Sequence, residues 1–308
     1  MAKHVFGPVP SRRLGFSLGV DIVPLKYCSY DCIYCQIGKT THKEIDRKSF
    51  FDPDLVIQEV MDTVKNPQKI DIITFSGSGE PTLNIDLGYM VRELKKKTET
   101  PVAVITNGSL LWMEEVRRDI LEADVVLPSL DAVSEDFFRY INRPHSLLEV
   151  RNIITGMKSF RREYNHQIWL EIMLIRDIND EPEELDLIKR IVGSLNADKI
   201  QLNTVTRPPR EESSGKVGDA DLIKICNSFG SSCEIICSFE KSVTEAPPEG
   251  ELTNIILETL KRRPLNLGDI VRTTNMSYFQ AKAKLKAMEK EGLIKSYFFD
   301  NNFFFMVP

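Results

Sequence analysis

The chain has 308 residues, of which 42% are hydrophobic and 28% charged, and its net charge is −5 at pH 7. This composition is typical of a soluble protein with a substantial core, and the length allows one large or two ordinary domains. Since no run approaches about 18 apolar residues and the start lacks an apolar secretory signal, we expect a cytoplasmic protein without membrane helices.

Six short apolar segments recur in the first 205 residues, with segments of helical apolar spacing between them. Nearly continuous apolar character is typical of strands that are covered on both faces of a parallel sheet. The alternation predicts an α/β fold with a partial (β/α) barrel of about six parallel strands. The expected strands are residues 17–23, 70–76, 101–107, 124–130, 168–175 and 199–205, and residues 233–242 could add one more.

Polar clusters follow the expected strands where each one ends. The cysteine-rich stretch KYCSYDCIYC (26–35) follows the first strand, and the turn Gly-Ser-Gly-Glu-Pro (77–81) follows the second. Thr-Asn-Gly (106–108) follows the third strand, and Ser-Leu-Asp (129–131) follows the fourth. Because barrel enzymes place their chemistry at the carboxyl ends of the strands, we expect these clusters to share one site.

The last part of the chain has a different pattern. Residues 244–251 have the prolines and glycine of a linker, which divides a barrel domain (1–243) from a C-terminal domain (244–308). Three helical segments and a hairpin follow, and this order predicts a winged helix-turn-helix domain. The third helix begins with a capping box at Ser277 and Gln280. We expect the site in the barrel to stay intact when the chain is cut in the linker, because the barrel motifs end before it.

Residues 251–308 hold nine Lys and Arg and six Asp and Glu, although the whole chain is acidic. Lys282, Lys286 and Lys290 share one side of the expected third helix. Such a face is either solvated or used for nucleic-acid recognition. Four other basic residues could bind an anionic substrate or form surface ion pairs, and they are Arg12, Arg13, Arg143 and His145.

Three of the six cysteines fall within eight residues, at Cys28, Cys32 and Cys35. In a reducing compartment such clusters bind metals or react more often than they form disulfides. A structural zinc site normally needs four Cys or His ligands, and only His4 and His42 are near in sequence. An iron-sulfur cubane has four irons, so three thiolates leave one iron open for a small molecule. Cys226, Cys233 and Cys237 are either structural thiols or ligands of a second cluster.

The CxxxCxxC spacing, with Tyr34 before the last Cys, resembles the loop signature of the radical SAM superfamily. Over roughly residues 17–205 the supporting motifs fall in the order of that superfamily. The resemblance implies a 4Fe–4S cluster on Cys28, Cys32 and Cys35, and S-adenosylmethionine as the second cofactor. The residues it implies for S-adenosylmethionine are Tyr34, Ser78, Gly79, Glu80, Pro81, Asn107, Ser129, Asp131, Glu171 and Asn203.

By the same resemblance, Ser78 stands where the superfamily has Gly. The turn that it begins would contact the methionine amino group, and Tyr34 the adenine. Asn107 and the segment 129–131 would approach the methionine carboxylate and the ribose. The implied reaction is reductive cleavage of S-adenosylmethionine to a 5′-deoxyadenosyl radical that removes hydrogen from a substrate. A low-potential electron donor of the flavodoxin or ferredoxin type is the implied partner.

A narrower resemblance concerns a poorly characterised group related to the wyosine-forming tRNA enzymes. It is carried by the stretches FGPVPSRRLGFSLGVD, CIYCQIG, FSGSGEPTLN and LPSLDA. It favours an RNA base as the substrate. The alternatives are an enzyme that modifies a peptide or protein, and a redox-sensing DNA-binding regulator in which the cluster is a switch.

Overall fold

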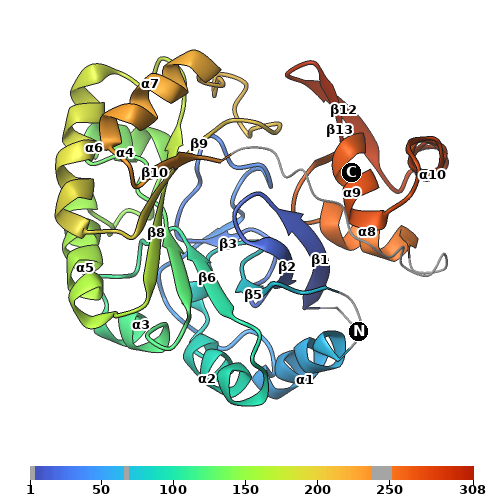
Figure 1. Cartoon of the computed structure of the whole chain (residues 1–308), viewed down its shortest axis with the longest axis horizontal. Helices are drawn as coiled ribbons and strands as arrows, with labels where there is room; N and C mark the ends of the chain where they lie inside the picture. The colour runs from blue at the N-terminus through green and yellow to red at the C-terminus, as the bar shows by residue number, and fades with distance from the viewer. Residues whose placement is uncertain (1–3, 66–68, 237–251) are drawn as a thin grey trace.

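The computed structural model describes residues 4–65, 69–236 and 252–308. Eight strands form one sheet in the order β1-β2-β5-β6-β7-β8-β9-β10, and helices lie along its outer side (Figure 1). Strands β2 to β10 of this sheet are parallel, and only β1 is antiparallel to its neighbour. The chain therefore has an α/β fold with a mostly parallel sheet, consistent with the predicted partial barrel.

The strands of this sheet lie close to the predicted segments. They are β1 (Val5–Ser11), β2 (Gly15–Val20), β5 (Ile72–Phe75), β6 (Val102–Thr106), β7 (Val125–Pro128), β8 (Gln167–Leu174), β9 (Lys199–Thr204) and β10 (Cys233–Ile235). All residues of β5 and β7 are buried, which explains their uninterrupted apolar sequence. β10 confirms the start of the strand expected at 233–242, and the rest of that segment lies outside the described residues.

β1 corrects the expectation that the sheet begins at residue 17. Its sequence VFGPVPS contains two prolines and a glycine, which are depleted in strands. Proline is tolerated here because β1 is an edge strand whose register shifts between Phe6 and Val9. The parallel part of the sheet also has seven strands, where about six were predicted.

The connecting helices bury one apolar face each against the sheet. Leu87, Met90, Val91 and Leu94 of α2, for example, recur at helical spacing and are fully or almost fully buried. The helices of this part are α1 (Pro53–Val64), the 3-10 turn η1 (Pro81–Leu83), α2 (Leu87–Lys97), α3 (Glu114–Asp119), α4 (Glu135–Ile141), α5 (Val150–Glu163), α6 (Pro182–Leu195) and α7 (Asp219–Phe229). Two short strands, β3 (Tyr27–Cys28) and β4 (His42–Lys43), pair within the cysteine loop.

Residues 252–308 fold around a core of their own, which includes Ile256, Ile270 and Leu285. The helices are α8 (Leu252–Leu260), α9 (Leu267–Thr274) and α10 (Tyr278–Lys290), and the strands are β11 (Leu265–Asn266), β12 (Lys295–Phe299) and β13 (Asn302–Met306). The predicted three helices, the hairpin and the capping box at the start of α10 are all present. β11 adds a third strand, giving a sheet in the order β11-β13-β12.

This C-terminal unit lies beside β1 (Figure 1), and ion pairs join it to the barrel. Nε of Arg262, just after α8, donates to Oδ2 of Asp21 at 3.0 Å, and both side chains are buried. Phe299 at the end of β12 packs against the barrel core. No helix in the described ranges is long and apolar enough to cross a membrane.

Candidate active site

The three clustered cysteines lie in the loop after β2. Cys28 ends β3, which pairs with β4, and Cys32 and Cys35 follow in consecutive tight turns. Within these turns Cys35 N donates to Cys32 O at 3.1 Å, and Gly38 N donates to Cys35 O at 3.1 Å. Tight turns return the chain on itself, so the loop holds its three thiols in one region.

Two side-chain amides from distant segments approach these sulfurs. Nδ2 of Asn107, after β6, donates to Sγ of Cys28 at 3.6 Å. Nδ2 of Asn142, at the end of α4, donates to Sγ of Cys32 at 3.5 Å. Hydrogen bonds to a sulfur favour its ionised form and tune a cluster bound to it. The two amides therefore favour thiolates at Cys28 and Cys32, whereas burial opposes them.

Burial of the three thiols opposes their ionisation. Burial raises the pKa of Cys28 to about 12, with Glu80 as the second cause, and burial also raises the pKa of Cys32 and Cys35. Bound metal would supply the positive charge that ionises them. Among the described residues, no three Cys, His, Asp or Glu side chains stand close enough to share one metal ion. A cubane does not require this, because each thiolate binds a different iron.

The turn 77–81 is fastened to the start of the cysteine loop. Glu80 N donates to Tyr27 O at 3.1 Å, and a Cβ built on Gly79 would lie only 1.8 Å from the same oxygen. Ser78 donates through both its N and its Oγ to the Asp21 carboxylate. A glycine in place of Ser78 would lose the hydroxyl bond, so the departure from the superfamily motif has a structural use.

The Glu80 carboxylate connects this turn to the end of β6. Its Oε1 accepts from the hydroxyls of Thr82 and Thr106, each at 2.6 Å, and its Oε2 accepts from Asn107 N at 2.7 Å. Burial raises the pKa of Glu80, and these bonds partly oppose the rise. Since the residue is only 2% exposed, Glu80 organises the turn from within the core.

Asp131, which follows β7, accepts three hydrogen bonds. Its Oδ2 accepts from the Tyr34 hydroxyl at 2.6 Å and from Asn142 Nδ2 at 2.7 Å, and its Oδ1 accepts from Met173 N at 3.0 Å. Burial raises the pKa of Asp131 to about 6, although these bonds lower it. Asn142 thus contacts both Asp131 and Cys32, which links the cysteine loop to the strand ends.

Glu171 on β8 forms a second polar group. It accepts from Asn203 Nδ2 at 2.8 Å and is ion-paired with Arg13. Burial opposes its ionisation, but Arg13, Asn203 and Arg12 together outweigh burial and hold the pKa of Glu171 below its ordinary value. Glu171 is therefore a fixed, charged acceptor.

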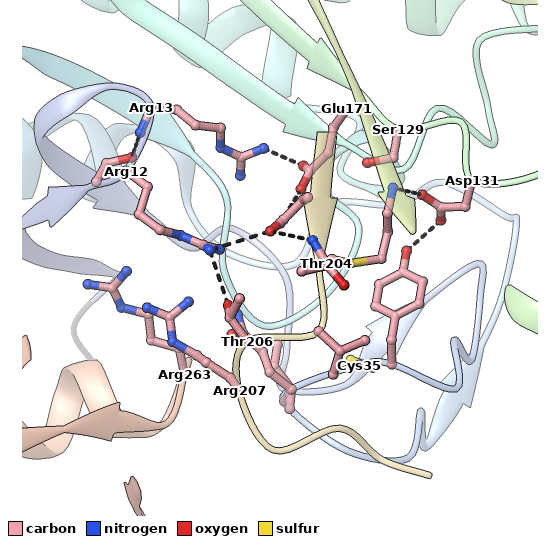
Figure 2. Close-up of a pocket in the computed structure, with 17 residues that line it drawn as sticks. Arg12, Arg13, Cys35, Ser129, Asp131, Glu171, Thr204, Thr206, Arg207 and Arg263 are labelled. Atoms are coloured by element: carbon pink, nitrogen blue, oxygen red, sulfur yellow. Dashed lines mark hydrogen bonds and ion pairs between the residues drawn. The ribbon is translucent and has the colours of Figure 1, made fainter. Parts of the chain in front are cut away.

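A cavity of about 300 Å³ lies where the ends of β7, β8 and β9 meet the cysteine loop (Figure 2). The predicted site residues that line it are Tyr34, Cys35, Ser129, Asp131, Glu171 and Asn203. The predicted residues outside its lining are Cys28, Cys32, Ser78, Gly79, Glu80, Pro81 and Asn107. The structure therefore separates a pocket group from a group that surrounds or supports the cysteine loop.

The four basic candidates differ in their surroundings. Arg12 and Arg13 line the pocket, whereas Arg143 and His145 do not. Arg143 pairs with Glu211 at 2.8 Å, and the backbone N of His145 donates to a carbonyl of the cysteine loop. Of the four, Arg12 combines a place in the pocket with hydrogen bonds to neutral acceptors alone.

The other cysteines lie away from this pocket. The Sγ atoms of Cys226 on α7 and Cys233 on β10 are 2.9 Å apart. Cys237 lies outside the described residues. Only two of the three thiols that were considered either structural or ligands of a second cluster can therefore be placed, and neither lines the pocket.

Three further residues of the site were missed from the sequence. Asn142 stands in INRPH, where the flanking basic residues drew attention instead. Arg207 belongs to a segment with ordinary loop composition, and Arg263 follows a helix of the C-terminal unit. The signal for Arg207 and Arg263 is spatial, because nothing in the chain order predicts that they line the pocket.

Residues 22–188 match the Radical SAM superfamily. A UPF0026 protein of Methanocaldococcus jannaschii is 44% identical, over 67% of this chain and 65% of that protein. A Brachyspira hyodysenteriae protein named GTPase Obg is 38% identical, over 95% of this chain and 43% of that protein. The chain thus spans less than two thirds of either relative.

Two more distant similarities are one in sequence and one in fold. The dual-specificity RNA methyltransferase RlmN of Alcanivorax borkumensis is 22% identical over 59% of this chain and 50% of that protein. The structure of TYW1 with a lysine-pyruvate adduct bound superposes with a TM-score of 0.54 and 16% identity, over 73% of this chain and 75% of that chain. Because the superfamily match covers more than half of its residues, the chain belongs to the radical SAM superfamily.

Proposed function

We propose that this protein is a radical SAM enzyme in which Cys28, Cys32 and Cys35 hold the cluster. The superfamily uses a 4Fe–4S cluster and S-adenosylmethionine. The observation that carries the proposal is the pair of amides that donate to the sulfurs of Cys28 and Cys32. Amide donors stabilise sulfur that bears negative charge, and a buried thiol acquires that charge when it binds iron.

When bound, the reduced cluster supplies the electron that cleaves S-adenosylmethionine to methionine and a 5′-deoxyadenosyl radical, which takes a hydrogen atom from the substrate. Tyr34 would present its ring to the adenine, because its hydroxyl is held by Asp131. Ser129, Glu171 and Asn203 would orient the ribose and the substrate through polar contacts in the pocket. A flavodoxin or ferredoxin would serve as electron donor.

Asn107 and the turn 77–81 have a supporting role in this proposal. Asn107 donates a hydrogen bond to the sulfur of Cys28. The turn 77–81 is hydrogen-bonded to Tyr27, which directly precedes Cys28 in the chain. Both therefore act on the position and charge of the Cys28 sulfur. We assign them to the cluster side of the site, where the methionine amino and carboxylate groups are expected.

We propose that residues 244–308 form a winged helix-turn-helix domain that delivers an RNA substrate. The element order α8-β11-α9-α10-β12-β13 supports this domain type. On α10, Lys282, Lys286 and Lys290 are exposed while Ala281 and Leu285 are buried, so the lysines are free to contact phosphates. The similarity to an enzyme named as an RNA methyltransferase favours RNA over a peptide.

The cluster assignment is tested by reconstituting the protein with iron and sulfide under anaerobic conditions. The wild-type protein should bind one 4Fe–4S cluster, and the variant with Cys28, Cys32 and Cys35 all changed to Ala should bind none. Cys226→Ala is the matched control and should retain the full cluster. A triple variant that keeps a full complement of iron and sulfide would refute the assignment.

A further inference from the structure

Arginines line one side of the pocket, and they come from three separate parts of the chain. Arg12 and Arg13 follow β1, Arg207 follows β9, and Arg263 follows α8. Figure 2 shows the guanidinium groups of Arg12, Arg207 and Arg263 gathered on the side opposite Asp131. The C-terminal unit thus contributes directly to the pocket.

Carboxylates neutralise only part of this charge. Arg13 is paired with Glu171. Arg207 lies 3.7 Å from Asp269, but the same carboxylate also accepts from Arg272 Nη2 at 2.9 Å. One carboxylate is therefore shared by two guanidinium groups, and the charge around the pocket remains positive.

Arg12 and Arg263 are the least satisfied of these side chains. Arg12 Nη1 donates to two neutral oxygens, Thr206 Oγ1 at 3.1 Å and Asn203 Oδ1 at 3.4 Å. Within the residues that the structure describes, the Arg263 side chain has no ion pair or hydrogen bond, and Asp269 attracts its charge only from farther away. The buried Nε atoms of Arg207 and Arg263 have no acceptor within the described ranges. Buried donors are usually paired, so these two Nε atoms are available to donate to a bound ligand.

Burial and mutual repulsion lower the pKa values of Arg12 and Arg263. Burial, followed by repulsion from Arg207, lowers the pKa of Arg263 to about 9. Burial, again followed by Arg207, lowers the pKa of Arg12 to about 10. Both groups remain charged at neutral pH, so an anion among them would relieve repulsion and satisfy the free donors.

The geometry favours phosphate over a carboxylate. Guanidinium forks that converge from three segments match an anion with several oxygens on different sides, as a phosphate has. The methionine carboxylate of S-adenosylmethionine and the ribose are expected near Asn107 and the segment 129–131. Asn107 lies outside the lining of this pocket, and Ser129 and Asp131 line it on the side opposite the arginines, so the arginines are not needed for that carboxylate (Figure 2).

We propose that Arg12, Arg207 and Arg263 bind a phosphate group of the substrate, so that the substrate is a phosphate ester such as a nucleotide of RNA. This inference rests on the proposed function, because the arginines share the pocket with Tyr34 and Asp131. An RNA nucleotide turned out of its stack would place its base toward Asp131 and its phosphate toward the arginines.

The test measures binding of inorganic pyrophosphate to the full chain by calorimetry, with and without the reconstituted cluster. The variants are Arg263→Met and Arg207→Met, and the matched control is Arg151→Met, which removes an exposed arginine of α5. We expect wild-type protein to bind pyrophosphate and each pocket variant to bind it at least about tenfold more weakly, since a charge-assisted hydrogen bond is lost. Arg151→Met should bind as wild type does.

A second measurement guards against misfolding. Because the Arg263 charge is buried and its side chain has no ion pair or hydrogen bond among the described residues, Arg263→Met should unfold at the same or a higher temperature than wild type without ligand. Pyrophosphate should then raise the melting temperature of wild type more than that of the variant. Equal pyrophosphate binding by wild type and a folded Arg263→Met protein would overturn the proposal, as would no binding by wild type.

Further measurements identify the source of the phosphate and test whether the arginines bind the cofactor instead. Uridine monophosphate and a short single-stranded RNA are each tested as competitors of pyrophosphate, and competition by either supports the site and identifies its source. If Arg263→Met instead weakens S-adenosylmethionine binding as much as pyrophosphate binding, the arginines belong to the cofactor and the proposal fails. A protein that binds pyrophosphate but never a cluster would refute the proposed function and leave the phosphate site standing.

Discussion

Gly79 is the residue with the least room for change near the cysteine loop. A Cβ at this position would lie 1.8 Å from the Tyr27 carbonyl oxygen, a backbone atom directly before Cys28. A backbone atom cannot move aside as the end of a flexible side chain can. A methyl group here must therefore push the turn 77–81 away from the cysteine loop.

For Gly79→Ala we predict a loss of unfolding free energy of about 1 to 3 kcal/mol or more, as for other overpacked sites. The iron content after reconstitution should fall with it, because Cys28 is displaced. Gly193→Ala is the matched control, since nothing lies within 4 Å of the added Cβ on α6, where alanine is favoured over glycine. Denaturant unfolding and iron analysis check both variants, and a Gly79→Ala protein as stable as wild type would contradict this packing argument.

Single residues of the site were predictable from sequence where they belong to a compact motif. Tyr34 and Asp131 stand in short stretches that the resemblance covers, and the structure joins them by a 2.6 Å hydrogen bond. Asn142 donates to Cys32 from 110 positions away, and its own stretch has no metal-binding spacing. Contacts of this kind depend on packing, which the local sequence does not encode.

At the scale of elements, the end of α8 is tied to the turn 77–81 through Asp21. Asp21 accepts from Ser78 and, at 3.0 Å, from Nε of Arg262. The side chains of Arg262 and Asp21 are 9% and 6% exposed. Burial raises the pKa of Asp21, although both partners oppose that rise. Loss of the guanidinium would leave a buried carboxylate without its main source of positive charge.

We predict that Arg262→Met lowers the free energy of unfolding by about 3 to 5 kcal/mol at neutral pH, as expected when one partner of a buried pair is removed. The deficit should shrink as the pH falls toward the pKa of Asp21, because a carboxyl whose folded pKa is raised stabilises the folded state when it is protonated. The control Lys261→Met removes an exposed neighbour and should cost less than about 1 kcal/mol.

Denaturant titrations at several pH values measure these differences. Addition of Asp21→Asn to Arg262→Met should recover part of the loss, since the unpaired charge is then gone. An Arg262→Met protein whose deficit does not change with pH would show that the ion pair is not what holds α8 to the barrel.

The elements themselves were largely predictable, because buried parallel strands and amphipathic helices leave strong patterns in sequence. β1 was not, since its prolines are tolerated only at the edge of a sheet. The expectation that the barrel keeps its cluster after a cut in the linker stays a prediction, and such a cut would remove Arg262 from Asp21 and Arg263 from the pocket. Linker composition shows where a domain begins, but not how tightly it packs.

At the scale of the whole molecule, barrel and C-terminal unit together enclose the proposed site. The cysteine loop and the ends of β7, β8 and β9 supply one part of the pocket, and Arg263 adds a group from the other end of the chain (Figure 2). A substrate held by both parts would bridge them. In the proposed function, this arrangement would give the C-terminal unit a part in a reaction whose cofactor motifs all lie in the barrel.

The most direct test of the central claim is product analysis by chromatography after the reconstituted protein is reduced with S-adenosylmethionine present. We predict 5′-deoxyadenosine and methionine in equal amounts, formed at least slowly without substrate and absent from the protein that lacks Cys28, Cys32 and Cys35. Formation of S-adenosylhomocysteine alone, or no cleavage by a protein that carries a full, reduced cluster, would contradict it.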